Sequence, residues 1–210
     1  MTEPHAHTLH VVDDDAAFRR SLVFLLESVG WEVVAHASAE NFLARCTTQS
    51  DDVACLLLDI RMPTMSGLAL QQQLRARGWT VPVVFITGHG DVELAVQAMK
   101  HGASDFLEKP FKDQALIDAV ALAVRKGHAQ RADAARREEA LAVLERLSPR
   151  EREVARLLAL GLPNKLVARE LAISEKTVHV HRQHVMEKTA LGSAAELARL
   201  MLRADPHALD

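Results

Sequence analysis

The chain has 210 residues, of which 49% are hydrophobic and 25% charged, as in ordinary globular proteins. This length suits two modest domains, and the two cysteines indicate no disulfide framework. The sequence has no long apolar run and no signal-peptide pattern, which favours a cytoplasmic protein without a membrane span. Residues 1–127 carry 11 Lys/Arg and 16 Asp/Glu, whereas residues 148–204 carry 10 and 6. The basic C-terminal part therefore favours an anionic partner.

Short apolar runs alternate with longer helical patterns over the first 127 residues. The predicted strands are 8–12, 32–36, 54–59, 82–87 and 104–107. The predicted helices are 16–29, 39–45, 67–77, 91–101 and one that begins near Asp113. This alternation is typical of βαβ units, and the apolar strands indicate a parallel sheet covered on both faces. We therefore predict a doubly wound (βα)5 domain over residues 1–127.

A change of composition follows this domain. The stretch from Gly127 to Glu139 is rich in Ala, Arg and Glu and has no large apolar residue, so it cannot bury a face. Leu141, Leu144 and Leu147 then resume a short apolar stripe. We predict a helical linker over residues 128–147.

Residues 148–210 read as an all-helical domain. Ser148-Pro149-Arg150-Glu151 forms a capping-box pattern, and further helices are predicted at 164–171, 175–189 and 193–203. Only a three-residue turn separates the helix at 164–171 from the helix at 175–189. Two helices joined in this way are a helix-turn-helix.

Acidic side chains and one lysine follow the predicted strands. Asp13, Asp14 and Asp59 end two strands, Thr87 ends another, and Lys109 follows the last one. The carboxyl ends of parallel strands meet in one crevice, so we expect these groups to share a site. Clustered carboxylates need a cation, and an all-oxygen site suits Mg²⁺ beside a phosphate. Although each residue alone is more often a helix cap or a solvent-facing side chain, together they predict an aspartate that accepts a phosphoryl group.

Two sets of motifs resemble known families. The first set resembles the receiver domain of two-component response regulators, which has a flavodoxin-like fold. It consists of Val11-Val12-Asp13-Asp14-Asp15, Asp59-Ile60-Arg61-Met62-Pro63, Ile86-Thr87-Gly88 and Phe106-Leu107-Glu108-Lys109-Pro110. The second set resembles the LuxR-type DNA-binding domain, which has four helices. It consists of Leu147-Ser148-Pro149-Arg150-Glu151 and Lys176-Thr177-Val178-His179-Val180-His181-Arg182. Together they are similar to the NarL/FixJ family, and most of all to its FixJ branch.

For the receiver, the resemblance implies that Asp59 is the phosphoacceptor and that a sensor histidine kinase is its partner. Asp13, Asp14, Asp59 and the Arg61 carbonyl would bind Mg²⁺, and Thr87 and Lys109 would hold the phosphoryl oxygens. Phe106 takes the position of the family's aromatic switch. The face formed by residues 91–101 and 104–107 would make a homodimer on phosphorylation, so that the regulator acts on transcription through RNA polymerase.

For the C-terminal domain, we expect Val178, His181, Val185 and Thr189 to pack inward from the helix at 175–189. The resemblance implies that residues from this helix and the one before it bind double-stranded DNA at a pseudo-palindromic operator, and that Leu197, Leu200 and Met201 lie on the helix of the dimer contact. The predicted base readers are His179, Val180 and Gln183. The predicted phosphate contacts are Lys165, Lys176, Thr177, Arg182 and Lys188.

Other functions fit the sequence less well. A receiver that works as a phosphorylation-independent interaction module would not need the full set of Asp13, Asp14, Asp59, Thr87 and Lys109. An aspartyl phosphohydrolase usually has a second acid two residues after its nucleophile, where this chain has Arg61. We therefore predict a regulator and not an enzyme. His5, His7 and His10 read as a polar terminal segment and not as a metal site.

Overall fold

The computed structural model describes residues 8–47, 53–88 and 92–210. The chain forms two compact units, residues 1–130 and residues 131–210, which we describe separately. Among the described residues, no helix combines the length and the apolar character that crossing a bilayer requires. His5, His7 and the predicted helix start at residue 91 lie outside the described residues.

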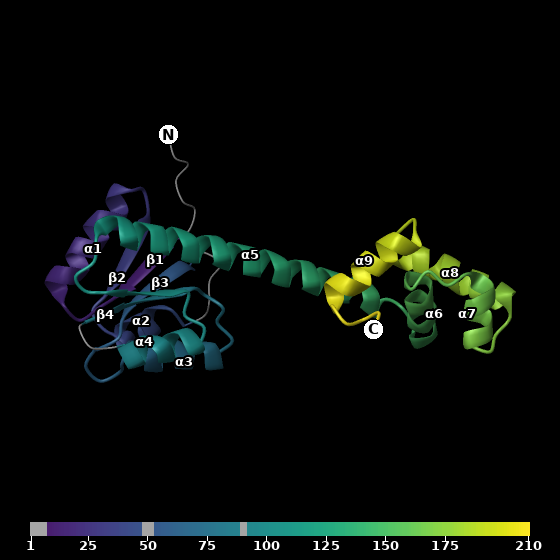
Figure 1. The fold of residues 1–210 in the computed structure, drawn as a ribbon, viewed down its shortest axis with the longest axis horizontal. Helices are drawn as coiled ribbons and strands as arrows, with labels where there is room; N and C mark the ends of the chain where they lie inside the picture. The colour runs from purple at the N-terminus through teal and green to yellow at the C-terminus, as the bar shows by residue number, and fades with distance from the viewer. Residues whose placement is uncertain (1–7, 48–52, 89–91) are drawn as a thin grey trace. The chain divides into compact units, whose positions relative to one another are not determined.

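A five-stranded parallel sheet organises the first unit (Figure 1). Its strand order is β2-β1-β3-β4-β5, which confirms the doubly wound fold predicted from the alternation of strands and helices. The strands are β1 (Thr8–Val12), β2 (Glu32–His36), β3 (Val53–Asp59), β4 (Val83–Thr87) and β5 (Asp105–Glu108). Each end lies within one residue of its prediction. The interpretation of His10 as part of a polar terminal segment is wrong, because its side chain is buried on β1.

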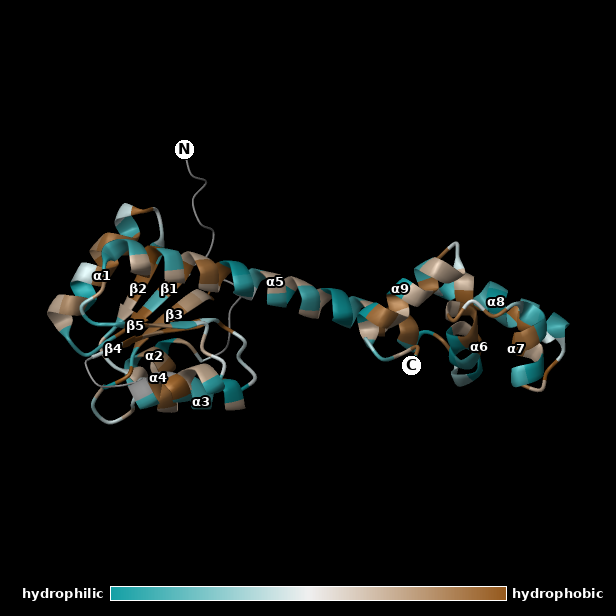
Figure 2. Cartoon of the chain, in the orientation of Figure 1, coloured by the Kyte–Doolittle hydropathy of each residue, from teal (hydrophilic) through white to brown (hydrophobic). Residues whose placement is uncertain are grey.

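Helices cover both faces of this sheet. α1 (Ala16–Ser28) and the start of α5 (Asp113–Glu145) pack on one face, around Leu26 and Leu116. On the other face lie α2 (Ala39–Arg45), α3 (Gly67–Ala76) and α4 (Val92–Lys100). Figure 2 shows the apolar strands between these two layers. Because both faces are covered, all seven residues of the central strand β3 are buried.

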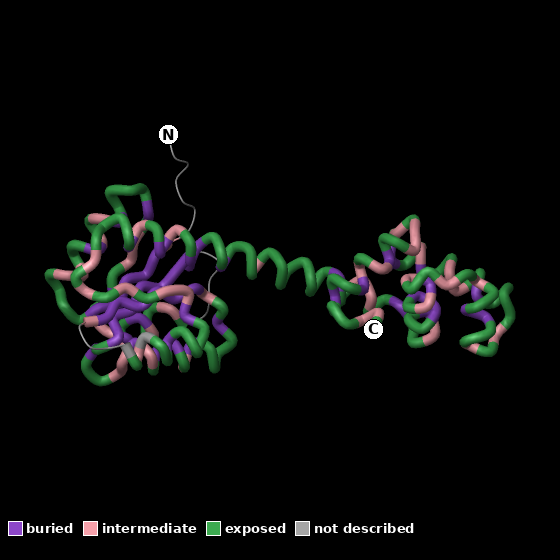
Figure 3. Tube along the Cα trace, viewed as in Figure 1, coloured by how far each residue is buried: buried purple, intermediate pink, exposed green. Residues whose placement is uncertain are grey.

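Helix α5 continues as one helix through most of the predicted linker. It runs to Glu145, and residues 132–139 are exposed on every side (Figure 3). These residues carry no large apolar side chain, as their composition indicated. The three-part division of the chain at residues 127 and 147 stays a prediction.

The second unit contains four further helices, which confirms the predicted all-helical fold. They are α6 (Pro149–Ala159), α7 (Asn164–Glu170), α8 (Glu175–Thr189) and α9 (Ala194–Ala204). Their common core includes Val154, Val167, Val178, Val185 and Leu197. Ser148 and Glu151 form the capping box that starts α6, and Ser174 caps α8. The short turn between α7 and α8 makes the helix-turn-helix.

Candidate functional site

A buried acidic pocket lies at the carboxyl edge of the sheet. Asp13 follows β1 and Asp59 ends β3, and their residues are only 1% and 7% exposed. Lys109 follows β5, with its ammonium Nζ 2.8 Å from Asp59 Oδ1 and 3.1 Å from Asp13 Oδ2. The structure therefore brings together the two carboxylates and the ammonium that the strand-end argument predicted.

Charge in this pocket is only partly balanced. Burial raises the pKa of Asp59, the Lys109 hydrogen bond opposes this rise, and the neighbouring Asp13 carboxylate adds to it. Burial alone would lower the pKa of Lys109, but its contacts with Asp59 and Asp13 outweigh burial and raise it. The Lys109 ammonium thus pairs with two buried carboxylates, and one positive charge cannot neutralise both of them.

Aromatic packing also positions Lys109. Its Nζ lies 3.9 Å from the centre of the Phe18 ring on α1, and Phe18 packs edge-on against Phe111. The Lys109 backbone N–H donates to the Thr87 carbonyl at 2.8 Å. A cation over an aromatic face is held electrostatically as well as by contact. Sequence reasoning missed Phe18, because nothing in the pattern of α1 connects it to residue 109.

The first turn of α1 fixes the backbone around Asp13. The Asp15 backbone N–H donates to Asp13 Oδ1 at 2.8 Å, while the exposed Asp15 side chain caps α1 through the N–H groups of Ala17 and Phe18. Arg19 donates to the Asp13 carbonyl at 2.6 Å. Sequence reasoning also missed Arg19; its only signal was its place six residues after Asp13, on the helix that Asp15 starts.

Gly67 allows a close approach to the Asp59 backbone. A Cβ at this position would lie 2.2 Å from the Asp59 carbonyl oxygen, which no side chain can accommodate without movement of the backbone. The Gly67 N–H donates to the Ile60 carbonyl at 3.0 Å. The start of α3 is therefore pressed against the strand end that carries Asp59.

The pocket has the donor set of a magnesium site. The exposed Asp14 lies at its rim and lines an open cavity of about 640 Å³ together with Arg61, Met62 and Ser66. Asp13, Asp14 and Asp59 bring three carboxyl groups to this edge of the sheet, and the Lys109 ammonium contacts two of them. Carboxylate, carbonyl and water oxygens beside an open cavity suit Mg²⁺, which keeps several of its waters. The residues present therefore fit this ion.

Thr87 and Phe106 occupy neighbouring strands of the sheet. Thr87 ends β4 and is buried, and its hydroxyl donates to the Gly88 carbonyl at 3.3 Å. Phe106 lies on β5 opposite Phe85 and is 41% exposed. The structure thus places Thr87 at the same sheet edge as Asp59, and Phe106 on the surface of the edge strand.

Most of the predicted DNA contacts lie on the open side of the helix-turn-helix. Val178, Val185 and Thr189 are buried and His181 is half-buried, as expected for the inward face of α8. Successive residues of a helix turn by about 100°, which puts other positions on the outer face. The predicted contacts that are exposed are Lys165, Lys176, Thr177, His179, Val180, Gln183 and Lys188.

Three of the predicted phosphate contacts also have partners within the unit, and one of them is Thr177, whose hydroxyl lies 2.8 Å from the Ser174 hydroxyl. Lys188 Nζ lies 2.7 Å from Oε2 of the buried Glu151, and this contact, with the Ser148 backbone N–H, lowers the pKa of Glu151 to about 2. Arg182 is half-buried and donates to the Asn164 side chain at 3.4 Å. No sequence pattern predicts that Lys188 contacts Glu151 of the capping box of α6. Lys188 therefore already joins two helices of the fold.

Helix α9 uses most of its large apolar residues for the core. Leu197 and Met201 are buried and Leu200 is half-buried, whereas Leu202 is exposed. The three residues that we expected on a dimer contact are therefore mainly core residues.

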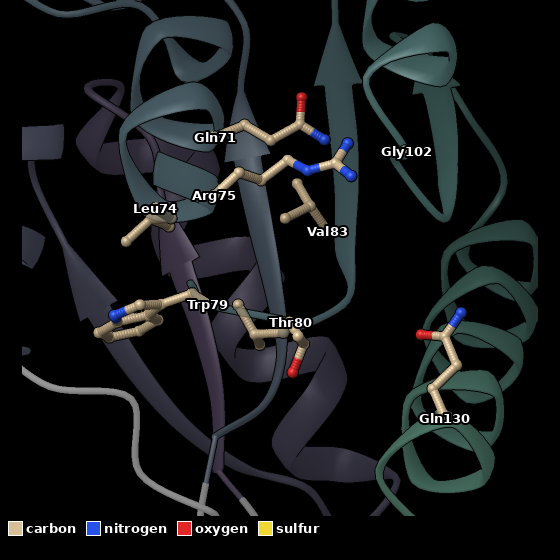
Figure 4. A pocket seen from close by; sticks show the side chains of 9 residues that line it. Gln71, Leu74, Arg75, Trp79, Thr80, Val83, Gly102 and Gln130 are labelled. Atoms are coloured by element: carbon tan, nitrogen blue, oxygen red, sulfur yellow. The ribbon is translucent and has the colours of Figure 1, made fainter. Parts of the chain in front are cut away.

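A second cavity, of about 280 Å³, lies at the opposite end of the sheet (Figure 4). Gln71, Arg75, Trp79 and Thr80 line it, near the beginning of β4. No carboxylate, thiol or imidazole is among its lining side chains. Its chemistry is therefore much poorer than that of the acidic pocket.

Comparison with known proteins supports both units. Residues 9–121 match the response regulator receiver domain, and residues 145–201 match the luxR family of bacterial regulatory proteins.

Similar full-length proteins combine these two parts. The chain is 47% identical to the transcriptional regulatory protein FixJ of Azorhizobium caulinodans, over 96% of this chain and 94% of that protein. It is also 47% identical to nodulation protein W of Bradyrhizobium diazoefficiens, over 90% and 83% of the two chains. The solved structure of the response regulator StyR matches with a TM-score of 0.79 and 42% identity, covering 93% of this chain and 98% of that one. With a receiver fold, an acidic pocket at its sheet edge and a helix-turn-helix unit, the chain belongs to the response regulators that join a receiver domain to a LuxR-type DNA-binding domain.

Proposed function

We propose that Asp59 accepts a phosphoryl group from a sensor histidine kinase and that this modification drives dimerisation and DNA binding. The contact of Lys109 with both Asp59 and Asp13 is the observation that carries the proposal. An ammonium placed between a nucleophilic carboxylate and a second acid can pair with a phosphoryl oxygen on Asp59. We also propose that the regulator acts in the cytoplasm, where its DNA target lies.

The transfer requires little of the protein beyond positioning and charge. An Asp59 carboxylate oxygen attacks phosphorus, so a P–O bond forms as the P–N bond to the kinase histidine breaks. The leaving imidazole keeps the electron pair of that bond and takes up a proton. Lys109 then pairs with one phosphoryl oxygen and the Thr87 hydroxyl donates to another, which is the electrostatic stabilisation that phosphoryl transfer needs. When bound to Asp13, Asp14, Asp59 and the Arg61 carbonyl, Mg²⁺ would neutralise charge on the same oxygens.

An apolar surface on α4 and β5 supports dimerisation. Val96, Met99 and Phe106 are 48%, 43% and 41% exposed although all three are large and apolar. We propose that Thr87 moves toward the phosphoryl group, that Phe106 turns inward into the space it leaves, and that a second copy of the chain then packs on this surface. A local change of charge would in this way bias a two-state element.

The dimer would present two copies of α8 to successive half-sites of a pseudo-palindromic operator. We propose that His179, Val180 and Gln183 contact base edges from the outer face of α8. Lys165, Lys176, Thr177, Arg182 and Lys188 would contact phosphates, which position a protein without reading sequence. Bound in this way, the dimer would activate transcription by contacting RNA polymerase.

Intact mass spectrometry tests the phosphoacceptor. The wild-type chain and the variant Asp59→Asn are incubated with Mg²⁺ and acetyl phosphate, and the same samples are run on a size-exclusion column. We expect one added phosphoryl group and a shift to dimer for the wild type, and neither for Asp59→Asn. The matched control is Asp118→Asn, which makes the same change at an exposed position of α5 and should behave as the wild type.

A phosphoryl group on Asp59→Asn would assign the chemistry to another residue. Wild type that gains no phosphoryl group from acetyl phosphate or from a histidine kinase would favour the alternative of a phosphorylation-independent interaction module. A modified wild type that stays monomeric would reject only the dimerisation step.

A further inference from the structure

Two histidines and a cysteine converge on the face of the sheet that α2 covers. His10 lies on β1, His36 ends β2, and Cys46 follows the last residue of α2. His10 Nδ1 lies 2.9 Å from His36 Nε2 and 3.8 Å from Cys46 Sγ, and the three atoms all lie within 4.8 Å of one another. Among the described residues, this is the one group of three or more His, Cys, Asp or Glu side chains with metal-ligand spacing.

The surroundings keep this cluster compact and its imidazoles neutral. The two rings stack with their centres 5.1 Å apart, and Phe42 packs edge-on against both. Burial lowers the pKa of His10, and burial and the neighbouring His10 lower the pKa of His36 to about 4. Metals bind the neutral form of imidazole. Each neutral ring therefore has one lone pair for a metal, and the proton in the hydrogen bond between His10 Nδ1 and His36 Nε2 moves to another ring nitrogen when both bind.

The spacing is close to that of a tetrahedral zinc site. With Zn–N bonds of about 2.0 Å and a Zn–S bond of about 2.3 Å, tetrahedral ligand atoms lie about 3.3–3.6 Å apart. The pair of imidazole nitrogens is a few tenths of an ångström closer than this, and the sulfur to His10 distance is slightly longer. The third distance, between the His36 and Cys46 ligand atoms, lies within 4.8 Å, so metal binding requires rotations of the side chains that bring all three distances into the required range. Cys46 is half-buried, so solvent can reach the cluster from its side.

We propose that His10, His36 and Cys46 bind one Zn²⁺ ion, with water in the fourth position. Binding removes the proton of the Cys46 thiol to solvent, and the thiolate and two imidazoles then hold the ion. Thiolate and imidazole suit zinc, whereas the oxygen ligands around Asp59 suit Mg²⁺. The two sites should therefore be filled by different metals, and the zinc site does not depend on the proposed phosphorylation.

Cobalt substitution tests this site in the full-length chain. Co²⁺ is titrated into the reduced protein with Mg²⁺ in large excess, so that the acidic pocket is already occupied. We expect one equivalent of Co²⁺ to give a thiolate-to-cobalt charge-transfer band and the intense visible bands of a tetrahedral ion. One equivalent of Zn²⁺ should then abolish both.

Three variants test whether Cys46 supplies the thiolate. Cys46→Ser should lose the charge-transfer band, and it should bind Zn²⁺ at least about tenfold more weakly against a chromophoric chelator. Cys55→Ala should keep the band, because Cys55 is fully buried elsewhere in the sheet. The double variant His5→Gln and His7→Gln should also keep it, which separates the site from adventitious binding by histidines near the start of the chain. Circular dichroism melting curves check that each variant is folded.

A second readout does not depend on spectra. A ligand that binds only the folded state raises the melting temperature, so Zn²⁺ should stabilise the wild type more than folded Cys46→Ser at the same concentration. The proposal is overturned if Co²⁺ gives no thiolate band with the wild type, if the band survives in Cys46→Ser, or if it disappears in the variant at residues 5 and 7.

Discussion

Lys109 satisfies two acids that are 46 residues apart in the sequence. Its ammonium contacts Asp13 and Asp59 and also lies over the Phe18 ring. Parallel strands explain why the three charged residues could be predicted together, since each follows a strand of one sheet. Phe18 and Arg19 were not predictable in the same way. Their role depends on how the first turn of α1 lies against the sheet, which no local pattern specifies.

The buried charge of Asp59 should make the receiver less stable as the pH rises. Burial raises the pKa of Asp59 in the folded state above its ordinary value of 3.8. The folded state therefore holds this proton more tightly than the unfolded state, and the resulting stability is lost as the pH rises through the raised pKa. In Mg²⁺-free buffer at pH 7, Asp59→Asn should have a higher melting temperature than the wild type. This difference should shrink toward zero as the pH falls below 3.8.

Asp14→Asn is the matched control for this experiment. It removes a carboxylate from the same pocket at an exposed position, so its melting temperature should change less. A lower melting temperature for Asp59→Asn at pH 7, or a difference that does not vary with pH, would contradict the assignment of a raised pKa.

Helix α8 has two roles: its outer face carries predicted DNA contacts, and its inner face packs in the core of the second unit. Its start, end and buried face were predictable from the Ser174 cap and from the spacing of Val178 and Val185. The contact of Lys188 with Glu151 could not be predicted, because it links two helices whose packing the sequence pattern does not specify. Glu151 both caps α6 and holds the end of α8.

Removing the charge of Glu151 should weaken the contact between α6 and α8 and lower the free energy of unfolding. Hydrogen bonds with Lys188 and with the Ser148 backbone N–H lower the pKa of Glu151 to about 2, so the stabilising effect of its charge is present above the ordinary value of 4.5 and is lost as the pH falls toward 2. We expect Glu151→Gln to cost about 1–3 kcal/mol of unfolding free energy at pH 7 and less in acid. Urea unfolding followed by circular dichroism measures both values.

Glu153→Gln offers the comparison on the same helix. Glu153 is exposed and forms an exposed ion pair with its neighbour Arg150, so its loss should change stability by less than about 0.5 kcal/mol. Equal effects of the two substitutions would mean that the link to Lys188 contributes nothing.

Gln183→Ala tests whether the outer face of α8 reads bases. A preferred operator is first selected from random DNA with the phosphorylated wild type. We expect the variant to bind this operator about 1–3 kcal/mol more weakly, because a bidentate contact to adenine is lost, and to bind random DNA unchanged. Equal losses on both DNAs would make Gln183 a backbone contact.

Lys165→Ala should give the opposite pattern. A lost phosphate contact weakens binding to operator and random DNA alike, and it lowers the slope of log affinity against log salt by about 0.9. Fluorescence anisotropy over a range of salt concentrations gives this slope for the wild type and the variant. An unchanged slope would remove Lys165 from the set of phosphate contacts.

At the scale of the whole chain, the order of elements was predictable because strands and helices alternate in the first part and only helices follow. The junction was harder to predict. The predicted boundary at residue 127 lies within α5, where a Cβ on Gly127 would come 2.3 Å from Pro82. Tight packing on the sheet therefore explains this glycine, and the composition of the segment that follows did not reveal a continuous helix.

Each compact unit should fold without the other. We expect residues 1–130 and residues 131–210, expressed separately, to unfold cooperatively and to retain phosphorylation and DNA binding respectively. Thermal unfolding of the two fragments, together with the phosphorylation and DNA-binding assays, checks this expectation. A fragment that lacks a cooperative transition would show that its core needs the other unit.

The exposed stretch of α5 has a kinetic consequence. Residues 132–139 bury no side chain, so what keeps them ordered is the helix hydrogen bonds, the helix propensity of Ala, Arg and Glu, the exposed Arg136–Asp133 ion pair and one hydrogen bond from Arg137 to the Ala204 carbonyl. Opening this stretch need not disturb either core, and it should therefore occur far more often than global unfolding. Its backbone amides should exchange with deuterium well before those of β3, and limited trypsin digestion should cut first at Arg136 or Arg137. Residues 132–139 would then be the first segment of this regulator to unfold, before the core of either unit.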